Sequence, residues 1–115
     1  MPKTIAIVIQ EDPRKTHRPV EALRIALGLA AGAHQTTVVL LNEAVRLLSE
    51  DTDDIVDVDI LEQYLPSFKQ LEIPFLLERK AVGEHVALRE EFKTQFENHE
   101  FIRDFIQSVD RSLVF

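Results

Sequence analysis

Three short apolar runs set the main constraint on how this chain folds. They occupy residues 4–10, 36–42 and 73–78, and they are nearly continuous rather than alternating with polar residues. Such runs are typical of strands that are covered on both faces, as in a parallel sheet. Helix-length segments at 19–33 and 60–71 separate them. The pattern therefore predicts an α/β fold, a three-layer α/β/α sandwich around a mainly parallel sheet of about five strands.

The remaining segments are expected to complete this sandwich. We predict a short helix at 43–49, a helix at 82–92, a strand at 93–97, a helix at 99–109 and a closing edge strand at 111–115. Asn98 is a suitable N-cap for the helix that follows it. That helix carries an apolar stripe expected to face the core, made of Phe101, Ile102, Phe105, Ile106 and Val109. Pro66 is expected to kink the segment 60–71 or to mark where its helix begins.

Composition narrows the class of protein. A chain of 115 residues is predicted to form a single domain over residues 1–115. The 20 acidic residues exceed the 13 basic ones, which argues against nucleic-acid and anionic membrane partners. The absence of cysteine excludes disulfides and a thiolate nucleophile. With no signal-peptide pattern at the N-terminus, a cytoplasmic location is expected.

The helix predicted at 19–33 is unusually apolar. After Glu21 and Arg24, every residue through Ala33 is apolar or small. A helix with one exposed face should show a polar stripe, so this helix is expected to be covered on most sides. One alternative is a tight fit within the chain. The other is a homo-oligomer, with an interface formed by Leu23, Ala26, Leu27 and Ala30.

Polar and charged residues follow each of the three buried strands. In a parallel α/β sheet, ligands bind beyond the carboxyl ends of the strands. A small anion or a nucleotide-like molecule is one interpretation, and solvated loop tips are the alternative. The candidate ligand-binding residues are Asp12, Arg14, His17, Arg18, Asn42, Glu43, Glu78, Arg79, Lys80 and His85.

No motif predicts an enzyme, a cofactor or a metal. The sequence contains no glycine-rich phosphate loop, no HExxH motif and no nucleophile elbow. The acidic segment 50–59 places Ile55 and Val56 where a calcium loop needs a ligand and a glycine. We therefore expect a solvated acidic loop, no catalytic residue and no bound metal.

Segments 5–48, 65–78 and 105–115 together resemble the DsrE/DsrF-like family of sulfur-relay and YchN-like proteins. The resemblance lies in the order of strands and helices, including the Ala- and Leu-rich first helix and the strand followed by "NEAVRLL". It implies a cytoplasmic domain of flavodoxin-like architecture that assembles into trimers or hexamers, with sulfur-metabolism proteins as partners.

The resemblance also implies where sulfur would be carried. Members that transfer sulfur use a cysteine just after the third strand, and here that position falls near Glu78. A carboxylate cannot hold persulfide sulfur, because the mechanism requires a thiolate. The expected role is a non-catalytic subunit.

A second resemblance is to the receiver domains of response regulators. Glu11 and Asp12 resemble the acidic pair that follows the first strand in those domains. The run 73–78 does not end in the aspartate that accepts the phosphoryl group. A degenerate signalling domain is therefore the third interpretation.

Overall fold

The computed structural model describes residues 2–83 and 86–115. Five parallel strands form one sheet in the order β4-β3-β2-β1-β5. The strands are β1 (Thr4–Ile9), β2 (Gln35–Leu40), β3 (Phe75–Glu78), β4 (Thr94–Glu97) and β5 (Arg111–Val114). The predicted parallel sheet is confirmed.

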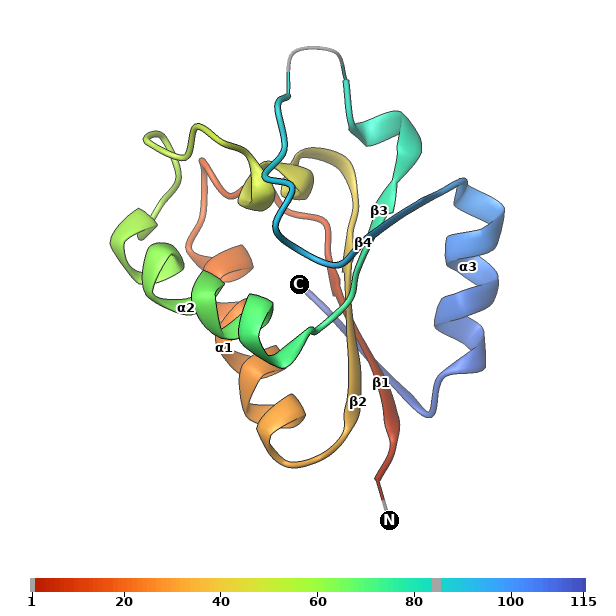
Figure 1. Cartoon of the computed structure of the whole chain (residues 1–115). Helices are drawn as coiled ribbons and strands as arrows, with labels where there is room; N and C mark the ends of the chain where they lie inside the picture. Colours follow the sequence, from red (N-terminus) through yellow and green to blue (C-terminus); the bar gives the residue numbers. More distant parts are fainter. Residues whose placement is uncertain (1, 84–85) are drawn as a thin grey trace.

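Helices cover both faces of this sheet (Figure 1). Two long helices, α1 (Arg18–Ala31) and α2 (Val58–Leu71), lie on one face, and the shorter α3 (His99–Ser108) lies on the other. Two 3₁₀ helices, η1 (Asn42–Leu48) and η2 (Arg79–Ala81), follow β2 and β3. The predicted three-layer α/β/α sandwich is therefore confirmed.

Alternate strand residues point to opposite faces, which explains why the apolar runs are continuous. In β1, Ile5, Ile7 and Ile9 join the large core beneath α1 and α2, whereas Ala6 and Val8 join the smaller core beneath α3. Aromatic rings strengthen the large core. The Phe75 ring lies 5.2 Å from that of Phe68 and 5.8 Å from that of Phe92, measured between centroids.

Helix α1 is covered mainly by the chain itself. Pro19 lies in its first turn, where a missing N–H costs nothing. Leu23 and Ala26 have no exposed surface and pack in the chain's own core, so they are not available to a second subunit. Leu27 and Ala30 are only partly buried. Of the four residues expected at a subunit interface, only Leu27 and Ala30 thus keep exposed surface.

Two local expectations in the middle of the chain are corrected. Helix α2 runs from Val58 to Leu71 with Pro66 inside it, so the helix does not begin near Pro66; Pro66 is exposed, while Leu65 and Phe68 anchor the helix in the core. The segment 82–92 contains no helix among its described residues. Instead, its backbone pairs with the end of η1: the Glu50 amide donates to Ala87 O, and the Arg89 amide donates to Leu48 O.

The remaining helices and the edge strand are close to expectation. Asn98 caps α3 as predicted, but only Ile102 of the predicted stripe is fully buried, and Phe101 is 42% exposed. Most of the segment 43–49 lies in the 3₁₀ helix η1 and not in an α-helix. Within the described residues, no helix has the length and apolar character needed to cross a membrane.

Candidate functional site at the carboxyl edge of the sheet

The polar turns after β2, β3 and β4 surround two adjoining hollows, which together we call the carboxyl-edge site. Glu78 and Lys80 line both hollows. The first, of about 430 Å³, is lined by Asn42, Glu43, Glu78, Lys80, Ala81 and Gly83. The second, of about 580 Å³, is lined by Glu78, Arg79, Lys80, Asn98, His99 and Glu100. The parallel strands bring these residues together because their carboxyl ends meet at one edge.

Arg14 does not reach this site as a free cation. Its Nη2 lies 2.9 Å from Asp12 Oδ2, its Nε donates to Asp12 Oδ1, and its Nη2 also approaches Glu43 Oε2 at 3.4 Å. The hydrogen bonds from the Arg14 side chain lower the pKa of Asp12 below its usual value. Arg46 makes a further ion pair with Glu43. The Glu43 carboxylate is therefore shared by two arginines at the rim of the first hollow.

The other predicted cations are dispersed as well. Arg18 pairs with Glu11 at 3.4 Å and lies over the Phe115 ring, 5.9 Å from its centroid. Arg79 donates a hydrogen bond to the backbone oxygen of Phe96 at 3.1 Å. Within the described part of the chain, no carboxylate lies within 4.0 Å of the Lys80 ammonium. Arg14 and Arg18 are thus paired with carboxylates, whereas Arg79 and Lys80 line the carboxyl-edge site without a carboxylate partner among the described residues.

The structure describes one of the two candidate histidines. His17 is exposed at the N-cap of α1, where its backbone oxygen accepts a hydrogen bond from the Glu21 amide. It does not line either hollow of the carboxyl-edge site. His85 lies outside the described residues.

The turn from β4 into α3 contributes residues that sequence reasoning missed. His99 Nδ1 lies 3.8 Å from Glu78 Oε2. Asn98 is engaged in capping α3, since its Oδ1 accepts the Phe101 amide at 2.8 Å. The signal was available, because the segment 98–100 follows a predicted strand in the same way as the other candidate residues.

The lining residues offer charges and hydrogen-bonding groups. Among the described residues that line the two hollows, none carries a hydroxyl or thiol group. The described chain also shows no group of three or more His, Asp or Glu side chains positioned to hold a metal ion. The arrangement suits the binding of a small polar molecule.

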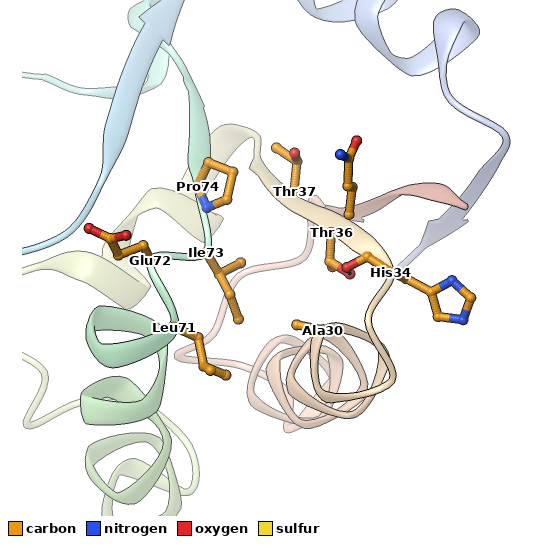
Figure 2. Close-up of a pocket in the computed structure, with 9 residues that line it drawn as sticks. Ala30, His34, Thr36, Thr37, Leu71, Glu72, Ile73 and Pro74 are labelled. Atoms are coloured by element: carbon orange, nitrogen blue, oxygen red, sulfur yellow. Dashed lines mark hydrogen bonds between the residues drawn. The ribbon is translucent and has the colours of Figure 1, made fainter. Parts of the chain in front are cut away.

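A third hollow lies at the opposite, amino edge of the sheet, and we call it the amino-edge pocket (Figure 2). It has a volume of about 380 Å³ and lies where α1 and α2 end. No residue predicted from the sequence as ligand-binding lines it; Ala30, expected at a subunit interface, does. Its lining residues are Ala30, His34, Gln35, Thr36, Thr37, Leu71, Glu72, Ile73 and Pro74.

Comparison with known proteins identifies the fold and nothing finer. No protein-family model matches this chain, and no curated protein sequence matches it. Among solved structures, the chain is similar to the crystal structure of the ychN protein from E. coli, with a TM-score of 0.78 and 18% sequence identity over 100% of both chains. At that identity the likeness concerns the fold alone, and the fold is YchN-like.

Proposed function

We propose that this chain is a non-catalytic subunit of the DsrE/DsrF-like kind, which assembles with copies of itself and does not carry sulfur. The observation that supports this proposal is full-length similarity to the ychN fold in a chain without cysteine. In the family that this chain resembles, sulfur carriers have a cysteine just after the third strand. Here the third strand, β3, ends at Glu78. Its carboxylate cannot form a persulfide.

Exposed apolar side chains support the self-assembly. All four residues of β5 are exposed, and Leu113 and Val114 are 42% and 55% exposed. Because successive strand residues point to opposite faces, apolar surface is open on both sides of this edge strand. Exposed apolar edges favour association with another chain. The half-buried Leu27 and Ala30 on α1 add to the candidate interface.

Size-exclusion chromatography with light scattering tests the assembly. We expect a trimer or hexamer, and Val114→Asp should shift it toward the monomer because it places a charge in the interface. Ile60→Asp is the matched control, since Ile60 is an exposed apolar residue on α2, away from β5. A monomer at every protein concentration would overturn the proposal.

A role near sulfur trafficking is the finer part of this proposal. It predicts a stable complex with a sulfur-carrying protein encoded nearby in the genome. Native mass spectrometry of the mixed proteins should detect that complex, and incubation of this chain alone with polysulfide should add no sulfur to its mass. If all such neighbours fail to form a complex, the sulfur role is wrong while the assembly proposal stands.

We also propose a second candidate function, the binding of a small zwitterion such as an α-amino acid at the carboxyl-edge site. The charges lining the 430 Å³ hollow favour it. Among the described residues that line this hollow, Lys80 is the cation, and Glu43 and Glu78 carry the carboxylates. Lys80 would hold the carboxylate of the ligand, and Glu78 its ammonium group. Because Glu43 is already paired with Arg14 and Arg46, Lys80 and Glu78 are the charges left for a ligand, one of each sign.

Thermal unfolding with a panel of ligands tests this candidate. Amino acids should raise the melting temperature, and sulfate, phosphate and ATP should raise it less. Lys80→Ala should abolish the shift with little effect on the free protein, whereas Lys93→Ala, an exposed lysine outside the site, should retain it. A larger shift with phosphate would favour the anion interpretation, and no shift with any ligand would exclude both.

A further inference from the structure

The edge strand β5 has backbone groups that the rest of the sheet does not use. The Phe115 amide donates to Val8 O at 2.7 Å, and Phe115 O accepts the Gln10 amide at 2.8 Å. Because successive strand residues turn their N–H and C=O groups to opposite sides, the backbone groups of Ser112 and Val114 point away from β1. Among the described residues, none forms a hydrogen bond with these outward groups.

The opposite edge strand, β4, is guarded by a cation. The Phe75 amide donates to Lys93 O at 2.8 Å, so by the same alternation the backbone groups of Thr94 and Phe96 point outward. Arg79 Nη2 donates to Phe96 O at 3.1 Å, which occupies one of the outward acceptors and places a charge at this edge. Charged side chains at a sheet edge protect it from pairing with another strand. Of the two edges, β5 is therefore the one open to a partner.

The open edge of β5 is complementary to itself. Antiparallel strands are joined by residue pairs that exchange both N–H···O bonds, and only residues with outward backbone groups can form such pairs here. When Ser112 of each copy pairs with Val114 of the other, all the outward groups of both strands are used. A register with Ser112 opposite Ser112 would need the Asp110 amide, which already donates to Thr4 O at 2.9 Å. A register with Val114 opposite Val114 would leave Ser112 without a partner in β5.

The side chains of β5 agree with the register that pairs Ser112 with Val114. In this register Leu113 lies opposite Leu113 of the second copy, in a pair without hydrogen bonds, where side chains are closest. Leu113 and Val114 are 42% and 55% exposed, and the second copy would cover both. Arg111, the only charged residue of β5, lies opposite Phe115. The pairing therefore brings no like charges opposite each other.

From these observations we propose that β5 pairs antiparallel with β5 of a second copy, so that two five-stranded sheets join into one continuous sheet across a twofold axis. The inference rests on the self-assembly proposed above and specifies the contact through which it occurs. A twofold contact joins subunits in pairs. Of the two expected assemblies, only the hexamer can therefore contain this contact at every subunit.

Single cysteine variants test the pairing and its register. The chain has no cysteine of its own, so any disulfide must join introduced residues. Opposite residues in a pair without hydrogen bonds have Cα atoms about 4.5 Å apart, a distance that a disulfide can span. Mild oxidation should therefore link most of the Leu113→Cys protein into covalent dimers, which a non-reducing gel and intact mass measure.

Two controls separate pairing from random collision. Phe101→Cys has a matched site, since Phe101 is 42% exposed like Leu113 but lies on α3. Ser112→Cys tests the register, because diagonal neighbours across two strands are about 7–8 Å apart, too far for a disulfide. Both controls should give only a minor fraction of covalent dimer. Equal linking of Leu113→Cys and Phe101→Cys would overturn the pairing, and more linking in Ser112→Cys than in Leu113→Cys would overturn the register.

Amide hydrogen exchange gives an independent measurement on the unmodified protein. The Ser112 and Val114 amides should exchange much more slowly than the outward Thr94 amide of β4, because the second copy accepts their hydrogen bonds. Equally fast exchange of the three amides would overturn the inference. If light scattering still shows an oligomer in that case, self-assembly stands and occurs through another surface. A trimer would likewise overturn only the β5 pairing, whereas a monomer at every concentration would overturn both proposals.

Discussion

Arg89 holds Glu62 through both of its terminal nitrogens, with Nη2 2.6 Å from Oε1 and Nη1 3.3 Å from Oε2. Its Nε also donates to the Ser49 carbonyl at 3.1 Å, and Thr52 donates its hydroxyl to Glu62 at 3.0 Å. The Arg89 side chain is 19% exposed, so these bonds are partly shielded from water. They fasten the irregular segment 86–92 to α2 and to the end of η1.

Replacing Arg89 by Ala should lower the free energy of unfolding by about 1–2 kcal/mol, because several hydrogen bonds to one charged group are lost together. Urea unfolding measures this loss. Arg103→Ala is the control, since Arg103 is exposed on α3 and pairs with its neighbour Asp104 at 3.7 Å; it should cost less than about 0.5 kcal/mol. Equal costs in the two variants would contradict a fastening role for Arg89.

The Asp12 carboxylate should make stability depend on pH in the acid range. Hydrogen bonds from Arg14 lower its pKa below the ordinary 3.8. A pKa that is lower in the folded state stabilises the fold at pH values above the unfolded-state pKa, and this contribution is lost as the pH falls through the folded-state pKa. Asp12→Asn should therefore cost about 1–2 kcal/mol near neutral pH, with a difference from the unmodified protein that shrinks below pH 3.8.

Urea unfolding at a series of pH values checks the Asp12 prediction. Asp53→Asn serves as the control, because Asp53 is an exposed residue of the acidic loop and forms no ion pair with the described residues. If the difference in unfolding free energy between Asp12→Asn and the unmodified protein stays constant across the acid range, protonation of Asp12 does not weaken its contact with Arg14.

Ala33 follows helix α1 with a φ of 69°, in the left-handed region that favours glycine. Ala33→Gly should raise the free energy of unfolding by about 0.5–1 kcal/mol, since it removes the steric conflict of the β-carbon. Ala31→Gly, two residues earlier and still inside α1, should lower it by a similar amount because glycine is a poor helix residue. Differential scanning calorimetry can compare the change in stability of the two variants. If both are stabilised or both are destabilised, this reasoning is refuted.

The Asn98 cap gives a fourth prediction. Its Oδ1 accepts the Phe101 amide, which is one of the helix's unpaired donors. Asn98→Ala should cost about 1 kcal/mol, and Asn98→Ser should restore most of it because serine is also a good N-cap. Thermal unfolding followed by circular dichroism measures both. A serine variant no more stable than the alanine variant would mean that the side-chain bond contributes nothing.

The sequence allows the layered sheet to be predicted because burial on both faces leaves a direct mark on composition, as in the Ile-rich β1. It does not reveal which strands are neighbours at the edges, since β5 contributes only exposed residues. The prediction of a helix at 82–92 is wrong because the backbone of residues 87–89 is held by hydrogen bonds to residues 48–50, far away in the chain. The start of α2 at Val58, before Pro66, likewise depends on core contacts such as those of Leu65 and Phe68.

The candidate site, too, could be predicted from the sequence only in part. Its location follows from strand ends, so Glu43, Glu78 and Lys80 could be predicted from position alone. The pairing of its charges could not, because the reach of Arg14 toward Asp12 and Glu43 depends on how the turns fold. Of the expected cluster of cations, Arg14 and Arg18 are instead paired with carboxylates.

The pairing of β5 with β1 also determines when the sheet can be completed. Val8 lies opposite Val114, and Thr4 is hydrogen-bonded to Asp110 across a sequence separation of 106 residues. During synthesis, the outer edge of β1 therefore stays open until residues 111–114 have left the ribosome. Contacts between such distant residues slow folding and leave strand edges open to wrong partners. The nascent chain is expected to be most prone to aggregation just before β5 emerges.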